Sequence, residues 1–143
     1  MRQVLVSVAQ SITHAQFQTT LDYMAVSWDF VDALSAQLGQ CKIVPGERRE
    51  WCVKGKAVAW ERPLSKRDIA ALGDAAPAGR VLAVHVPDVG VKQAWINAAP
   101  GVCFDSPHFA NYPAVLVNLE LADEQLVREL FEETATWLND TRS

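Results

Sequence analysis

The sequence contains little cysteine, and its three cysteines do not form a recognisable site. Cys41, Cys52 and Cys103 are odd in number and far apart, which excludes a disulfide framework and a C-x-x-C metal motif. A glycine-rich phosphate loop is also missing, because Gly73 and Gly79 are isolated. From motifs we therefore assign no catalytic residue, no metal ligand and no cofactor.

Long apolar runs are absent too. No stretch approaches the roughly 20 apolar residues that a membrane-spanning helix needs. The short apolar segment 4–9 is followed at once by polar residues and lacks the sustained apolar region and cleavage site of a secretory signal. We expect a cytoplasmic protein that has no membrane partner.

The third missing feature is an excess of positive charge. The net charge of −4 argues against a strong general nucleic-acid binder. The charges are unevenly distributed, however: residues 42–67 contain eight basic and three acidic side chains, and residues 88–143 contain nine acidic and three basic ones. The sequence therefore predicts a molecule with a basic end and an acidic end.

The length of 143 residues is typical of one domain. We interpret residues 1–23 as an N-terminal extension of uncertain structure and residues 24–143 as the domain. Ser27 is a good N-cap for a helix to residue 38, and Ser65 begins a capping box for a helix to residue 72. Two more helices are predicted at 91–98 and 123–138, the last strongly amphipathic, with an apolar stripe of Leu126, Leu130, Thr134, Trp137 and Leu138.

Five strands are predicted, at 49–53, 56–60, 81–86, 102–105 and 114–119. The first two form a hairpin around Lys54-Gly55, in a register that places Trp51 and Trp60 on the same, core-facing side. The tight links between strands favour a single, mainly antiparallel five-stranded sheet with helices packed on one face. The predicted fold class is α+β.

Several separated blocks carry a family resemblance. They are Lys56-Ala-Val-Ala-Trp-Glu-Arg-Pro63, Lys66-Arg-Asp-Ile-Ala-Ala-Leu-Gly73, Pro100-Gly-Val-Cys-Phe, Pro107-His-Phe and Tyr112-Pro-Ala-Val-Leu-Val117. In order and spacing they resemble the actinobacterial branch of the MmcQ/YjbR family over about residues 27–138. The resemblance implies a CyaY-like fold, also described as a double-wing DNA-binding domain. The family pattern has no set of catalytic residues that could be carried over to this chain.

The leading hypothesis is a non-enzymatic domain that binds DNA weakly and without sequence specificity through the hairpin and helix of residues 48–67. Basic side chains would hold the phosphates. They are Arg48, Arg49, Lys54, Lys56, Arg62, Lys66 and Arg67. Trp51 and Trp60 could stack on bases, although aromatic residues in such a hairpin are more typical of a core.

The alternative is a protein- or small-ligand-binding module that uses the 107–113 loop. Loops often carry function, and this one offers the ligand-binding candidates His108, Phe109, Asn111 and Tyr112. The same aromatic rings could instead fill the edge of the core. An enzyme or metal site at Cys103, Asp105 and His108 is a third, weaker hypothesis, because spacing alone does not establish a nucleophile and its base. The sequence indicates neither the cognate partner nor the oligomeric state.

Overall fold

The computed structural model describes residues 25–39, 41–44 and 46–141, so the extension expected at 1–23 lies outside the described residues. Six strands form one sheet in the order β1-β2-β3-β4-β6-β5, and every pair of neighbours is antiparallel. The strands are β1 Cys41–Val44, β2 Glu50–Val53, β3 Lys56–Glu61, β4 Val81–His85, β5 Cys103–Phe104 and β6 Ala114–Asn118. The helices are α3 Trp28–Gln37, α4 Lys66–Leu72, α5 Val89–Ala98 and α6 Glu124–Thr141, which together confirm the α+β class.

Each described helix begins at a polar side chain that accepts a hydrogen bond from the first turn. Ser27 caps α3, and Asp88 caps α5 through the amide of Val91. Ser65 and Asp68 form the predicted reciprocal capping box of α4. Asp123 accepts from the third residue after it at the start of α6. No helix in this described part of the chain is long and apolar enough to cross a membrane.

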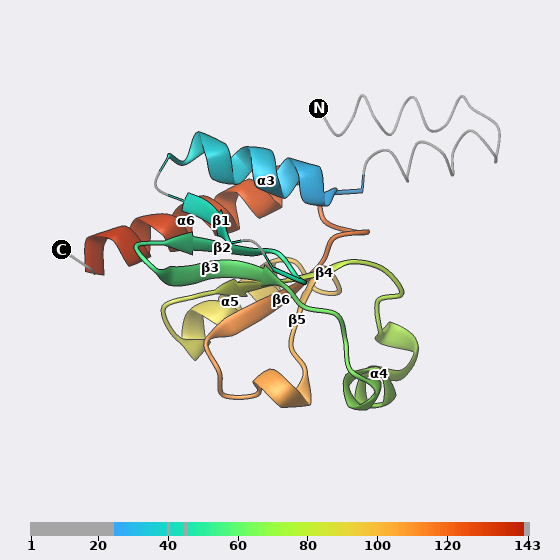
Figure 1. Ribbon diagram of the computed structural model, residues 1–143. Helices are drawn as coiled ribbons and strands as arrows, with labels where there is room; N and C mark the ends of the chain where they lie inside the picture. The colour runs from blue at the N-terminus through green and yellow to red at the C-terminus, as the bar shows by residue number, and fades with distance from the viewer. Residues whose placement is uncertain (1–24, 40, 45, 142–143) are drawn as a thin grey trace, which may run out of the picture.

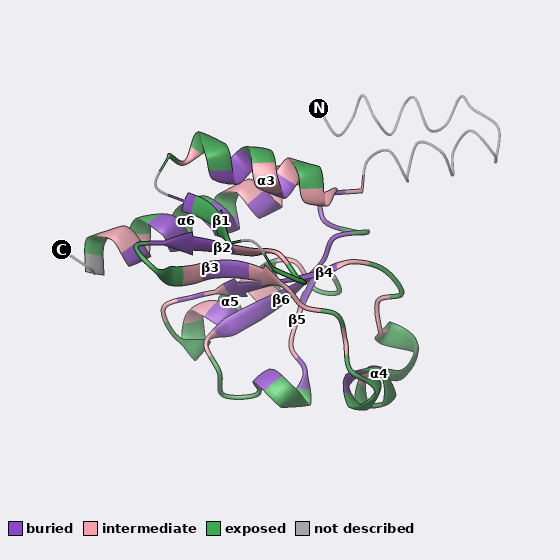
Figure 2. Ribbon diagram, viewed as in Figure 1, coloured by how far each residue is buried: buried purple, intermediate pink, exposed green. Residues whose placement is uncertain are grey.

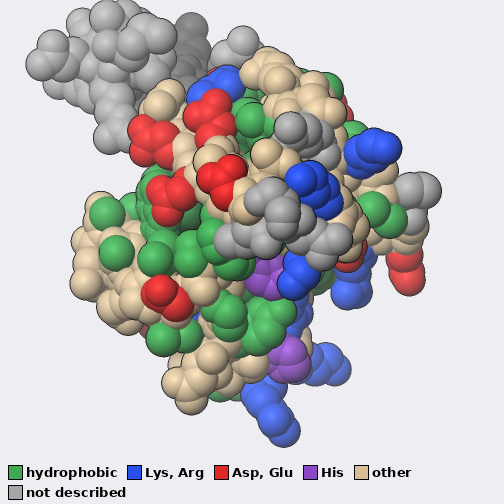
Figure 3. Space-filling model, turned by 90° about the vertical axis from the view of Figure 1, so that its left-hand side faces the viewer, with side chains coloured by type: hydrophobic (Ala, Val, Ile, Leu, Met, Phe, Trp, Pro, Cys, Tyr) green, Lys and Arg blue, Asp and Glu red, His purple; other side chains and the backbone are tan. Residues whose placement is uncertain are grey.

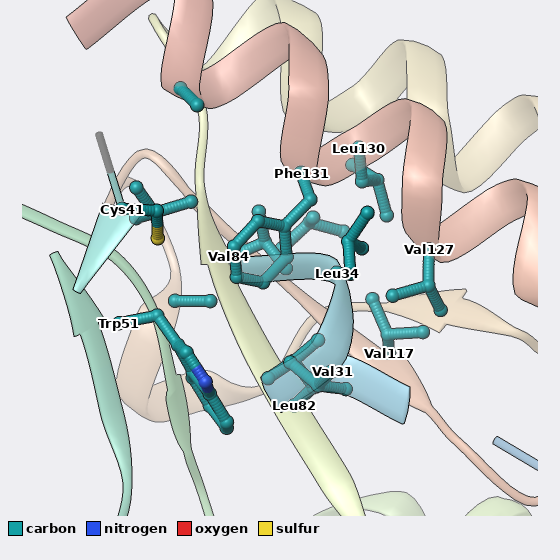
Figure 4. Packing of buried hydrophobic residues seen from close by; sticks show 14 of the residues in the cluster. Val31, Leu34, Cys41, Trp51, Leu82, Val84, Val117, Val127, Leu130 and Phe131 are labelled. Carbon is teal, nitrogen blue, oxygen red and sulfur yellow. The ribbon is translucent and has the colours of Figure 1, made fainter. Parts of the chain in front are cut away.

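The main hydrophobic core lies between the sheet and the helices α3 and α6. These two helices lie side by side over the same face of the sheet, as predicted (Figure 1). Trp51 is fully buried at the centre of this core (Figure 4). Its ring is stacked on Trp28 at 6.0 Å and lies edge-on to Phe131 at 6.2 Å. The deepest part of α6 is formed by Val127 and Phe131, which the predicted apolar stripe did not include.

The sheet contains one more strand than predicted. Strand β1 is short and lies at the edge, and only Cys41 of its four residues is buried. A period-2 alternation of apolar and polar residues cannot develop when three successive side chains are exposed. The pairing of β1 with β2 therefore left no signal in the sequence.

The predicted hairpin register is correct at the turn and wrong beyond it. Val53 pairs with Lys56 as expected, but a β-bulge displaces the register between Trp51 and Cys52. Because a one-residue shift moves side chains to the other face, Trp51 lies opposite Ala59, and Trp60 points away from the main core. The prediction that Trp51 and Trp60 share a face is therefore wrong.

The second face of the sheet carries a smaller cluster. It is made by Val81, Ala83, Phe109, Ala114 and Leu116, with Trp60, Leu64 and Phe104 packed against it. The 3-10 turn Pro107–Phe109 and helix α4 lie on this side, and α4 is largely exposed (Figure 2). We call this side the outer face.

Candidate functional site

Four aromatic side chains meet on the outer face. The ring of Trp60 lies 4.9 Å from that of His85 and 6.2 Å from that of Phe109. Tyr112 lies 5.7 Å from both His85 and Phe109. We call Trp60, His85, Phe109 and Tyr112 the aromatic cluster. Its members come from β3, β4 and the 107–113 loop. The bulge in the β2–β3 hairpin places the Trp60 side chain on this face of the sheet.

His85 fixes the exposed member of this cluster. Its Nδ1 lies 2.6 Å from the carbonyl oxygen of Ala57, and its Nε2 lies 2.9 Å from the hydroxyl oxygen of Tyr112. Because a carbonyl only accepts, Nδ1 carries the proton, which leaves Nε2 of a neutral ring to accept from the tyrosine hydroxyl. The Tyr112 ring is thus held in place although 43% of the residue surface is exposed. Both ring nitrogens of His85 are therefore paired within the protein.

A buried lysine holds the loop from behind. The Nζ atom of Lys92, on α5, donates to the carbonyl oxygen of Phe109 at 2.7 Å and to Oδ1 of Asp105 at 3.1 Å. Lys92 is only 3% exposed. The loop then turns at Asn111, whose φ of 67° is in the left-handed region that asparagine tolerates. Asn111 therefore shapes the turn that presents the following tyrosine.

A hollow of about 370 Å³ opens at this cluster, lined by Trp60, Arg62, His108, Phe109 and Tyr112. Four of these five residues come from the aromatic cluster or from its loop. The guanidinium of Arg62 lies 5.2 Å from the centre of the Phe109 ring, close enough for a cation–π contact. Three of the four loop candidates thus line one concave site, whereas Asn111 supports the turn beside it.

Arg62 is fixed by α4. Its Nη2 lies 3.2 Å from Oδ2 of Asp68, a side chain that is 1% exposed. Burial by itself raises the pKa of the Asp68 carboxyl, but hydrogen bonds from Ser65, the charge of Arg62 and the Ser106 hydroxyl outweigh it and lower the pKa below the usual value. The carboxylate is therefore ionised near neutral pH, and it anchors both the arginine and the first turn of α4.

The seven predicted phosphate-binding residues do not form one patch. Arg62 lines the hollow, and Lys66 and Arg67 follow it in the exposed first turn of α4. Lys54 and Lys56 lie at the tip of the hairpin, where Nζ of Lys54 approaches the carbonyl oxygen of Asn139 in α6. The remaining two are Arg48, exposed before β2, and Arg49, which is paired on the α3 side with Asp32 at 3.7 Å and Glu61 at 3.9 Å.

One exposed lysine of the outer face was not among the predicted site residues. Lys42 on β1 pairs with Cys52, which pairs in turn with Ala57, so the three side chains form a row across the outer face. That row ends beside His85, which contacts the Ala57 carbonyl. Glu50 lies on the same face and accepts a hydrogen bond from the Cys52 thiol. Lys42 was overlooked because β1 had no recognisable pattern.

The surface view shows the resulting distribution of charge. Lys and Arg side chains run down the right and lower sides of Figure 3, next to the histidines, and Asp and Glu side chains gather at the upper left. This segregation agrees with the predicted basic and acidic ends. In this view, Lys and Arg side chains therefore lie close to the histidines.

A larger hollow of about 610 Å³ lies at the end of the sheet, beyond Arg62, and is lined among others by Trp28, Arg80 and Glu120. Arg80 binds Glu120 through two side-chain hydrogen bonds, of 2.7 and 3.2 Å. This pairing raises the pKa of Arg80 and lowers that of Glu120. Because these charges satisfy each other, this hollow offers less unpaired charge to a ligand than the rim of the outer face does.

The three residues of the enzyme hypothesis are not assembled. Cys103 is fully buried in the main core, where burial raises the pKa of its thiol to about 11. His108 is exposed and lies against Phe109 of the other cluster, and Asp105 is bound to Lys92. Within the described residues, no three His, Cys, Asp or Glu side chains are placed to hold a metal ion.

Comparison with known proteins supplies a family. An uncharacterised protein of Mycobacterium tuberculosis is 47% identical over 92 residues, which cover 62% of this chain and 70% of the relative. The chain belongs to the same family. An uncharacterised protein of Mycobacterium bovis is also 47% identical to this chain, over the same share of each sequence. No family model and no solved structure matches the chain.

Proposed function

We propose that this chain is an MmcQ/YjbR-like, non-enzymatic domain of the cytoplasm that binds nucleic acid weakly and without sequence specificity. The binding surface is the outer face. Its aromatic cluster contacts bases, and the basic residues around it hold phosphates. The observation that carries the proposal is the position of the aromatic cluster between Lys42 and Arg62. Arg62 is bound through Asp68 to the first turn of α4, which carries Lys66 and Arg67.

The phosphate contacts fall mainly to Lys42, Lys66 and Arg67. All three are exposed, and their charges are available to a phosphate without first breaking a buried ion pair. Arg62 is different, because it is bound to Asp68 and lies over Phe109. It would mainly position the aromatic cluster, because part of its hydrogen-bonding capacity is already used by Asp68. Three or so contacts on a chain of net charge −4 support weak, salt-dependent binding.

The cysteines support the proposed cytoplasmic location. Cys41, Cys52 and Cys103 are all free and buried, which fits a reducing compartment.

The negative charge of α6 lies on the side of the sheet away from the aromatic cluster, so its carboxylates need not approach a strand bound to the outer face.

Binding is tested by fluorescence anisotropy with labelled single-stranded and duplex DNA at low and rising salt. Replacing Lys42, Lys66 and Arg67 together with Gln should abolish most of the binding. It should also flatten the slope of log affinity against log salt by about 2, since each phosphate contact on a single strand contributes about 0.7.

A matched control makes the same change in charge at basic residues outside the proposed surface, at the hairpin tip and before β2. Arg48, Lys54 and Lys56, each changed to Gln, should leave affinity and salt slope nearly unaltered. An equal or larger loss in this control would move the site to the hairpin tip. If the unaltered protein binds neither probe at low salt, the alternative of a small-ligand or protein module at the 107–113 loop takes its place, favoured by the 370 Å³ hollow.

A further inference from the structure

We infer that the hollow between Trp60, Arg62, His108, Phe109 and Tyr112 holds one unpaired base, so that the domain prefers single strands to duplexes. This inference rests on the proposed function and adds what the hollow recognises. A base stacked and paired within a duplex cannot enter a concave site, whereas a base of a single strand can turn into it.

The hollow has the aromatic lining on which a base can stack. It is lined by the rings of Trp60, Phe109 and Tyr112, and the centroids of neighbouring rings are 5.7 to 6.2 Å apart. Aromatic walls stack on any base, which gives affinity with little sequence preference. The rim adds hydrogen-bonding groups from the His108 ring and the Arg62 guanidinium, which can meet the polar edge of a base.

The hollow is also organised before any ligand arrives. Tyr112 is an exposed aromatic residue whose hydroxyl is tied to His85 at 2.9 Å. Phe109 is held by its carbonyl bond to Lys92 and by Arg62 over its ring. A ring that is already immobile loses little conformational entropy when a base stacks on it. Of these two rings, Phe109 is buried and Tyr112 is exposed, so Tyr112 is the ring most open to a base.

The charge around the hollow selects the kind of aromatic ligand. A cation already lies over the Phe109 ring, so a positively charged ligand would be repelled there. Lys66 and Arg67 follow in the first turn of α4, which is tied to Arg62 through Asp68. A flat ring linked to phosphates satisfies both features, and this is the chemistry of a nucleotide within a strand.

Three probes of equal length separate base recognition from phosphate binding: a single-stranded oligothymidylate, the same chain without its bases, and a duplex. The unaltered protein should bind oligothymidylate about tenfold more tightly than either of the other two, as one stacked base provides. The probe without bases keeps the phosphates, so this comparison needs no change in the protein.

Paired variants locate the effect. Tyr112→Leu and Trp60→Leu should remove the preference for oligothymidylate, while Tyr112→Phe and Trp60→Phe should keep most of it, because an aromatic face persists. The exposed Ile43→Ala on β1 serves as the control and should change nothing. Circular dichroism establishes that each variant is folded.

The outcomes distinguish the two proposals. If all three probes bind equally and the leucine variants match the unaltered protein, phosphate binding stands and the base-holding hollow is wrong. If none of the probes binds, the proposed function fails, and the hollow inference fails with it.

Discussion

The Nζ atom of Lys92 lies 2.7 Å from the carbonyl oxygen of Phe109, with the lysine almost completely buried. This bond joins α5 to the loop that forms the aromatic cluster. Lys92→Met fills similar volume but removes the donor, which leaves the buried carbonyl without its partner. We expect a loss of about 2 kcal/mol in the free energy of unfolding, measured with urea. Faster amide hydrogen exchange at residues 105–112 should accompany it.

The control for this change is one residue away. Gln93→Met alters the exposed side of the same helix and should stay within about 0.5 kcal/mol of the unaltered protein. Equal stability of the Lys92 and Gln93 variants would show that the lysine does not anchor the loop.

The lowered pKa of Asp68 predicts that the stability of the protein falls at low pH. Since its pKa in the folded state lies below the ordinary 3.8, its stabilisation is complete above that value and disappears as the pH falls through the lowered pKa. Asp68→Asn should therefore cost about 1–3 kcal/mol near pH 7 and progressively less toward pH 2. Unfolding curves at four or five pH values measure this difference. A cost that is the same at pH 7 and pH 2 would contradict the ionised, anchoring carboxylate.

The buried thiol of Cys103 should be inert. With its pKa raised to about 11, almost none of it is thiolate at neutral pH, and the thiolate is the reactive form. A thiol reagent should label the native protein slowly compared with the urea-unfolded chain. Cys103→Ala should cost about 1–2 kcal/mol through the cavity it leaves. Rapid labelling near neutral pH that disappears in His108→Ala would falsify the core role and reopen the enzyme hypothesis.

The helices and the central strands could be predicted because their signals are local. Ser27, Ser65 and the Asp123-Glu124 pair mark helix starts by capping chemistry, and the apolar run 81–86 marks a buried strand. The α+β class followed from the order of these elements and the short links between them.

The features that form the site depend on tertiary structure. The bulge between Trp51 and Cys52 reverses the face of Trp60, and nothing in the hairpin sequence distinguishes it from a regular ladder. Lys92 resembles a solvent-facing helix residue until the 105–109 loop folds over it. Lys42 sits on an edge strand with three exposed residues. His108, Phe109 and Tyr112 could be grouped from the sequence because they lie in one loop, but their contact with β3 and β4 could not be predicted.

The most direct test of the outer-face proposal is a titration followed by ¹⁵N–¹H NMR. Oligothymidylate is added to the labelled protein at low salt, and the amide and indole shifts are followed. We predict the largest shifts at the Trp60 indole, at residues 108–112 and in the first turn of α4. Lys42 should also shift, but less than the Trp60 indole, because it contacts a phosphate and no base ring. Shifts concentrated on α3, α6 or the tip at Lys54-Gly55, with the Trp60 indole unmoved, would contradict nucleic-acid binding by the outer face.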